Sequence, residues 1–101
     1  MDIDKNIRMA VDTGKVIMGY RSVSNALTDA SLKLVIIASN SPKEFADAIK
    51  EKAKVSNIPV YVYEGTSIDL GSACGRPFPV SFLGILEQGN SALLDLAKSS
   101  Q

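Results

Sequence analysis

The apolar run at residues 33–39, which reads KLVIIAS, constrains the fold of this chain more than any other segment. The five residues in its centre are all apolar, and no polar residue alternates with them. A strand of this composition has to be covered on both of its faces, which is typical of a strand inside an α/β protein. The run therefore predicts a sheet with helices packed on both sides.

The rest of the chain alternates between helical and strand patterns. Apolar residues at helical spacing, with capping residues and glycines at the ends, predict helices at about 3–13, 22–27, 42–56, 70–74 and 92–98. Runs of β-branched and aromatic residues predict strands at 16–20, 33–39, 60–63 and 80–86. This alternation predicts an α/β protein built as a three-layer α/β/α sandwich. The length of 101 residues, without a repeat or linker, predicts a single domain over 1–101.

Local signals predict where the helices begin and which faces they bury. The expected N-terminal caps are Asp2 or Asp4, Ser22 or Ser24, Ser41 and Thr66. Pro42 suits the first position of the third helix, and Thr66 with Asp69 resembles a capping box. The inner face of the third helix is expected to consist of Phe45, Ala46, Ile49 and Ala53.

The chain has no histidine and a single cysteine, Cys74. Without histidine there is no imidazole base, no Ser-His-Asp triad and no histidine metal ligand. One cysteine forms neither an internal disulfide nor a cysteine-rich zinc site, and Cys74 is expected to be a buried structural thiol. Most carboxylates fall at helix caps or on outer helix faces, where solvation explains them. We therefore expect no catalytic residue, no metal site and no cofactor.

The charges balance, with 11 basic and 11 acidic residues. A net charge of zero excludes a polybasic tail that holds nucleic acid by bulk charge, and also an acidic disordered chain. The apolar runs are far shorter than the roughly 20 residues of a membrane helix. The N-terminus is acidic where a secretory signal is basic. We expect a soluble, cytoplasmic protein without a membrane partner.

Glycine and polar residues in the loops are the remaining candidates for a binding site. Gly14-Lys15 lacks the other residues of a Walker A loop, and Gly71–Gly75 does not match a dinucleotide-binding loop. The loop residues that could converge on one end of the sheet are Lys15, Arg21, Asn40, Gly65, Thr66, Arg76 and Phe78. Helix N-termini and arginines bind phosphate, and an aromatic ring packs against an unstacked base. Together these features suit irregular RNA, while turn geometry is the alternative explanation for the glycines.

Five sequence blocks, in this order and spacing, resemble one known family. They are TGKVIMGYRS at 13–22, KLVIIASN at 33–40, IPVY at 58–61, EGTS at 64–67 with LG at 70–71, and GRPF at 75–78. The family is the large-subunit ribosomal protein of the thirty-e type, found in archaea and eukaryotes, within the superfamily of kink-turn RNA-binding proteins. The resemblance covers about residues 3–97, and the compact length without basic extensions favours the archaeal type.

The resemblance implies a four-stranded mixed sheet, no catalysis, and binding to a kink-turn. A kink-turn is an RNA helix that bends sharply at an internal loop with tandem sheared G·A pairs. The RNA-binding residues that it implies are Gly19, Arg21, Ser22, Asn40, Gly65, Thr66, Ser67, Arg76 and Phe78. A helix beginning at Ser22 offers N–H groups to phosphate, Asn40 pairs with a base edge, and Phe78 packs against an extruded base.

Two positions depart from the pattern of the family. Asn25 joins the implied RNA-binding set at a position where relatives often have lysine, and Pro79 stands where some relatives have a basic residue. The family is also usually basic, whereas this chain is neutral. These departures concern the affinity for RNA more than the fold.

We therefore expect a structural constituent of the large ribosomal subunit that stabilises a kink-turn of ribosomal RNA. Its expected partners are this RNA and neighbouring large-subunit proteins, with the free protein a monomer and the working protein cytoplasmic and ribosome-associated. One alternative is a kink-turn in another non-coding or regulatory RNA. The others are a protein-interaction module on the same fold and a small phosphate-ligand enzyme that uses the loop from Gly65 to Gly75.

Overall fold

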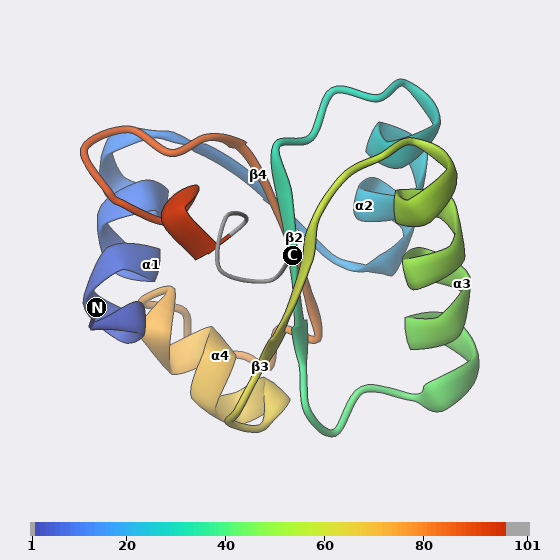
Figure 1. The fold of residues 1–101 in the computed structure, drawn as a ribbon. Coiled ribbons are helices and arrows are strands. Elements are labelled where there is room, and N and C mark those ends of the chain that lie inside the picture. Colours follow the sequence, from blue (N-terminus) through green and yellow to red (C-terminus); the bar gives the residue numbers. More distant parts are fainter. Residues whose placement is uncertain (1, 97–101) are drawn as a thin grey trace.

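The computed structural model describes residues 2–96 and contains a four-stranded sheet (Figure 1). The strands are β1 (Lys15–Met18), β2 (Leu34–Ala38), β3 (Val60–Tyr63) and β4 (Phe82–Glu87), in the spatial order β1-β4-β2-β3. β2 and β3 are parallel, and β4 is antiparallel to both β1 and β2. The sheet is therefore mixed, as the family resemblance implies.

Helices cover both faces of this sheet. α1 (Ile3–Thr13) and α4 (Ser67–Ala73) lie on one face, and α2 (Tyr20–Thr28) and α3 (Lys43–Val55) lie on the other (Figure 1). The buried apolar side chains form two clusters, one beneath each pair of helices. This is the three-layer α/β/α arrangement that the alternating pattern predicts.

β2 separates the two apolar clusters and is buried along its whole length. Leu34, Ile36 and Ala38 belong to the cluster beneath α1 and α4. Val35 and Ile37 belong to the cluster beneath α2 and α3. Because successive side chains of a strand point to opposite faces, a strand with an apolar core on each side has no position for a polar residue. The prediction from residues 33–39 is confirmed.

The beginning of α2 differs from the prediction. β1 ends at Met18 rather than at Tyr20, and α2 begins at Tyr20 rather than near Ser22 or Ser24. Gly19 connects the two elements with a φ of 103°, a backbone conformation that favours glycine. The chain therefore turns from strand to helix within one residue.

The aromatic ring of Tyr20 explains this early start. Its centroid lies 4.6 Å from that of Phe45 and 5.6 Å from that of Phe82, so the ring packs between α3 and the sheet. The sequence predicts Phe45 on the inner face of α3, but its side chain is 46% exposed. Phe45 packs against Tyr20 at the margin of the core. The buried residues of α3 are Ala46, Ile49 and Ala53.

The helix caps agree with the prediction at two sites and differ at a third. Asp2 caps α1, and Thr66 caps α4 in a complete capping box, so that α4 begins earlier than predicted, directly after Thr66. Ser41 does not cap α3, because Pro42 occupies the cap position. The Ser41 hydroxyl instead donates a hydrogen bond to the Ser81 carbonyl at 3.2 Å.

The last two predicted elements are also shifted. β4 begins at Phe82 rather than at Val80, because the Val80 N–H donates to the Ser67 carbonyl at 2.9 Å and so belongs to the preceding loop. In the described part of the helix predicted at 92–98, the Leu96 N–H donates to the Leu93 carbonyl at 2.9 Å in a single turn. The rest of this predicted helix lies outside the described residues.

The strand directions decide where the loops lie. β1, β2 and β3 run the same way, so their carboxyl ends share one end of the sheet with the amino end of β4. In Figure 1 this is the lower end, at which β2 leads into α3. The pair formed by Lys15 and Glu87 lies at the opposite end. The loops after β1, β2 and β3 and the segment before β4 therefore share the lower end of the molecule.

Candidate nucleic-acid interface

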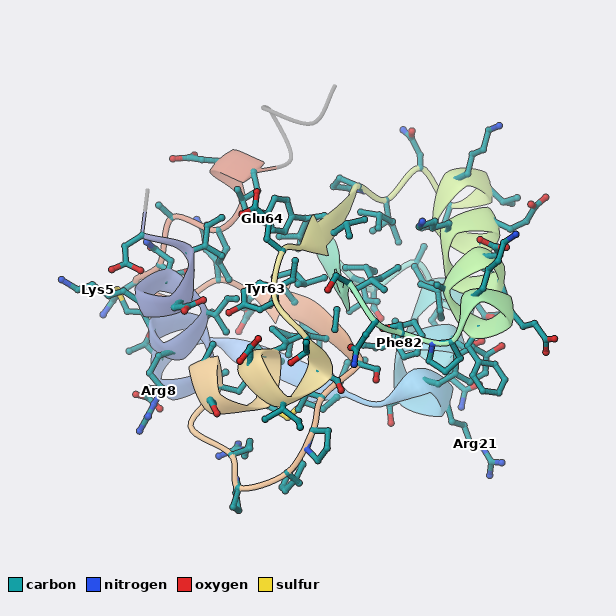
Figure 2. The ribbon with its side chains drawn as sticks, turned by 90° about the horizontal axis from the view of Figure 1, so that it is seen from below. Lys5, Arg8, Arg21, Tyr63, Glu64 and Phe82 are labelled. Atoms are coloured by element: carbon teal, nitrogen blue, oxygen red, sulfur yellow. The ribbon has the colours of Figure 1, made fainter. Side chains whose placement is uncertain are left out.

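Four segments form the surface at the carboxyl ends of β1, β2 and β3, and we call this surface the loop interface. Figure 2 looks onto it from below, with Arg21 at the start of α2 pointing away from the body of the protein. The predicted residues in these four segments are Gly19, Arg21 and Ser22 after β1, Asn40 after β2, Gly65, Thr66 and Ser67 after β3, and Arg76 and Phe78 before β4. Predicted residues that are far apart in the sequence are thus brought to one end of the sheet.

Hydrogen bonds tie these segments to one another. The Ser67 N–H donates to Oδ1 of Asn40 at 2.8 Å, which joins the loop after β2 to the first turn of α4. The Ser39 N–H and hydroxyl both donate to the Gly65 carbonyl, at 3.0 Å and 2.8 Å. The Gly19 N–H donates to the Phe82 carbonyl at 2.9 Å. The loop interface is therefore held by the sheet and by bonds between loops.

The bond to Ser67 also sets the orientation of the Asn40 amide. An N–H donor requires an oxygen, so Oδ1 faces Ser67. The Nδ2 group has no partner within residues 2–96, and the residue is exposed. Asn40 therefore presents two N–H donors to a ligand, which suits an acceptor on a base edge or a phosphate.

The first turn of α2 offers backbone donors. No side chain caps this helix, and its cap residue is Gly19, so the N–H groups of the first turn have no intrahelical partner. A Cβ atom added at Gly19 would meet no other atom within 4 Å, so the backbone is open to close approach. Arg21, Ser22 and Asn25 are exposed on this helix. The turn can therefore bind an anion through backbone N–H groups, with a guanidinium beside it.

Gly65 and Thr66 shape the loop after β3 rather than presenting side chains to a ligand. A Cβ atom at Gly65 would lie only 2.6 Å from the Tyr63 ring, so a larger residue does not fit without a shift. The Thr66 hydroxyl accepts from the Asp69 N–H, and the Asp69 carboxylate accepts from the Thr66 N–H at 3.0 Å. Both Thr66 groups are thus used within the capping box, and they fix the start of α4.

The segment before β4 contributes an exposed aromatic ring. Phe78 is 50% exposed and lines a groove of about 320 Å³ with Ile68, Ser72, Arg76 and two prolines. The backbone of this segment lies tightly on α4, because a Cβ atom at Gly71 would be 2.1 Å from the Phe78 carbonyl oxygen. Ile68, which is 66% exposed, is a candidate that the sequence analysis missed. The sequence could have indicated it, because Ile68 is an apolar residue in the first turn of a capped helix, on the side that faces solvent.

Lys15 is not part of the loop interface. The sequence pattern predicts it beside Arg21 and Asn40, but it lies at the amino end of β1, where its Nζ is 3.8 Å from a carboxylate oxygen of Glu87. The grouping fails because a residue at the start of a strand lies at the opposite end of the sheet from the residues that follow the strand. Lys15 is therefore a natural control for experiments on the loop interface.

The chemistry available elsewhere is limited. Cys74 is buried, and burial raises the pKa of its thiol to about 11, which keeps it protonated and unreactive near neutral pH. Within residues 2–96, no group of three or more acidic or cysteine side chains is placed to hold a metal ion. None of the helices in this part of the chain is long and apolar enough to cross a membrane.

The chain is similar to known proteins along almost its whole length. A large ribosomal subunit protein eL30 from Methanothermobacter thermautotrophicus is 49% identical over 96 residues, covering 95% of this chain and 98% of that protein. The protein of the same name from Methanocaldococcus jannaschii is 45% identical over 101 residues, covering 100% and 92%. These relatives are named as ribosomal proteins and not as enzymes.

A solved structure with a similar fold comes from Bacillus halodurans C, where the protein is described as having unknown function. It has a TM-score of 0.84 and 22% sequence identity, and the match covers 97% of both chains. At this identity the likeness concerns the fold alone. The model of the ribosomal protein L7Ae/L30e/S12e/Gadd45 family matches residues 1–95. On this match and on the two archaeal relatives, the chain belongs to the ribosomal protein L7Ae/L30e/S12e/Gadd45 family.

Proposed function

We propose that this protein is a structural constituent of the large ribosomal subunit and that it binds a kink-turn of ribosomal RNA through the loop interface. The names of the two archaeal relatives support the place in the large subunit. The resemblance of the sequence blocks supports the kink-turn as the RNA element. The ribosome-associated, cytoplasmic location and the neighbouring large-subunit proteins as partners are part of the same proposal.

The observation that carries the RNA-binding proposal is the bond between Asn40 and the Ser67 N–H. It orients two amide donors outward at the centre of the loop interface. The open first turn of α2 lies on one face of the sheet, and the segment with the exposed Phe78 packs on α4, on the other face (Figure 1). A bent internal loop offers both phosphates and unstacked bases, and this surface has donors for the first and an aromatic ring for the second.

The neutral charge of the chain predicts a particular kind of binding. With three or four phosphate contacts, the slope of log affinity against log salt is expected to be modest, roughly −2 to −4. Shape recognition and base contacts therefore supply much of the selectivity. Asn25 places a neutral side chain on the exposed part of α2, which fits a small electrostatic contribution to the affinity for RNA.

A calorimetric titration tests the proposal. The protein is titrated with a short kink-turn RNA and with a control in which the tandem G·A pairs become Watson–Crick pairs. We expect a loss of at least ~100-fold on the control, about 2.7 kcal/mol. Equal, weak binding to both RNAs would contradict the proposed interface. Sedimentation with large ribosomal subunits then distinguishes ribosomal RNA from another kink-turn RNA as the ligand in the cell.

A further inference from the structure

β3 is an edge strand, and its outer side has no partner within residues 2–96. Its inner side pairs with β2, and the carbonyls of Pro59 and Gly65, which flank the strand, accept bonds from Val35 and Ser39. In a parallel pair, the backbone groups of alternate residues point toward the partner strand and away from it. The outward N–H and C=O groups of β3 therefore belong to Val60 and Val62.

Within residues 2–96, this edge lacks most of the features that usually prevent pairing. Edge strands are commonly protected by a lysine, a proline, a bulge or a covering segment. β3 reads VYVY, contains neither lysine nor proline and pairs with β2 in a regular register, with Pro59 directly before it and Glu64 directly after it. Val62 is 48% exposed at its centre. No strand among residues 2–96 pairs with the outer side of β3, so this side is available to a further strand.

A groove of about 280 Å³ runs beside the same edge, between α1 and β3. Its lining consists of Ile3, Asp4, Tyr61, Tyr63, Glu64 and Gly65. Figure 2 shows Tyr63 and Glu64 on the side of β3 toward α1. The two sides of an added strand would therefore meet different surfaces, with the groove on one face of the sheet and the exposed Val62 on the other.

The groove has a negative charge. Among residues 2–96, the charged residues that line it are Asp4 and Glu64, and the Asp4 carboxylate accepts a hydrogen bond from the Tyr63 hydroxyl at 2.5 Å. Partial burial, and then the charges of Glu64 and Asp4, raise the pKa of the Tyr61 hydroxyl above its ordinary value. The groove is thus complementary to a basic side chain and repels phosphate.

We propose that the β3 edge binds an extended segment of a partner protein by strand addition, and that this segment alternates apolar residues with lysine or arginine. Its backbone pairs with the outward groups of Val60 and Val62. Its basic side chains enter the groove and meet Asp4 and Glu64, while its apolar side chains cover Val62. A second copy of this chain is a poorer occupant, because β3 itself has no basic residue to meet these carboxylates.

Three synthetic peptides test this proposal. The basic probe reads SGVKVKVKVGS, the acidic probe replaces each lysine with glutamate, and the third probe replaces the two central valines of the basic one with proline. At low salt we expect the basic probe to bind at least ~10-fold tighter than the acidic one, with a difference that shrinks as salt is added. We expect no binding of the proline probe, because proline has no N–H for the ladder.

Amide hydrogen exchange locates the bound peptide. Saturating basic peptide is expected to slow exchange at Val62 at least ~10-fold, since its outward N–H becomes hydrogen-bonded. Val62→Pro removes that donor without removing a bond to β2, and we expect it to abolish peptide binding. Glu64→Gln is expected to reduce the preference for the basic probe. Val55→Thr, at an exposed apolar site on α3, is the matched control and should change nothing.

Three results of the peptide and hydrogen-exchange experiments would overturn the proposal. They are equal affinity for the basic and acidic probes, protection by the peptide that excludes Val62, and self-association of the free chain that protects Val62 without any peptide. Kink-turn RNA binding is measured in parallel on Val62→Pro. Unchanged RNA binding with lost peptide binding supports a separate protein site. Loss of RNA binding as well would assign the edge to RNA and refute the partner proposed here.

Discussion

The Asn40 side chain accepts a hydrogen bond from the Ser67 N–H at 2.8 Å, across 27 positions of sequence. This one bond positions the first turn of α4 and orients the free amide donors of Asn40. A structural role and the proposed RNA-binding role thus meet in the same side chain. Substitutions at this residue can separate the two roles, because a replacement side chain can keep the acceptor oxygen while it lacks the N–H donors.

Asn40→Asp and Asn40→Ala are expected to have different effects on stability. Alanine removes the acceptor for Ser67 and should lower the free energy of unfolding by about 1 kcal/mol. Aspartate keeps an oxygen acceptor, so its unfolding in urea should stay closer to that of the parent. Both lose the outward donors, and calorimetry should show RNA binding weakened about 5- to 150-fold. An aspartate variant that binds RNA like the parent would contradict this role.

Arg21→Ala is expected to weaken RNA binding and to reduce the salt slope by about one unit, because it removes one phosphate contact. The matched control is Lys15→Ala, which removes a positive charge at the opposite end of the sheet. Titrations at several salt concentrations measure both quantities. If the two variants changed the slope equally, the effect would be one of net charge and not of position.

Phe78→Ala is expected to lower RNA affinity by about 1–3 kcal/mol, the range for stacking of one base on an aromatic ring. Stability should change little, because half of the side chain is exposed. Ile68→Ala should have a smaller effect in the same direction, since it removes another wall of the groove. Val55→Ala at the end of α3 is the control, and its RNA affinity should equal that of the parent.

Gly71→Ala is expected to destabilise the protein by about 1–3 kcal/mol through overpacking. The added Cβ would lie 2.1 Å from the Phe78 carbonyl oxygen, so the segment that carries the Phe78 ring has to move. RNA affinity should therefore fall even though residue 71 is buried away from the ligand. Val55→Ala, at an exposed site on α3 outside this groove, should retain both stability and affinity. Urea unfolding and calorimetry compare the two variants.

Alkaline pH is expected to destabilise the fold through Cys74. Burial raises the pKa of its thiol from 9.0 to about 11, so the folded state favours the protonated form. The resulting stability is fully present below pH 9 and is lost as the pH rises through 11, about 2–3 kcal/mol in all. Unfolding under reducing conditions from pH 8 to 11 measures this loss. Cys74→Ala should show a shallower pH dependence, and an unchanged one would exclude the thiol as its cause.

The sequence by itself determined those features that depend on neighbouring residues. The run at 33–39 predicts a strand buried on both faces, because five consecutive apolar side chains leave no solvent face. Thr66 and Asp69 are three positions apart, and this spacing alone closes a capping box. Local patterns of this kind were enough to predict the layers of the fold and the order of the loops.

Only the tertiary structure decided which distant residues meet. The direction of each strand places Arg21 and Asn40 at one end of the sheet and Lys15 at the other. In the sequence, all three are polar residues next to a predicted strand. The rings of Phe45 and Phe82 decide that Tyr20 is helical, and no nearby residue signals this. The physical reason is that strand pairing and side-chain packing join segments that are remote in the chain, and their partners cannot be read from local spacing.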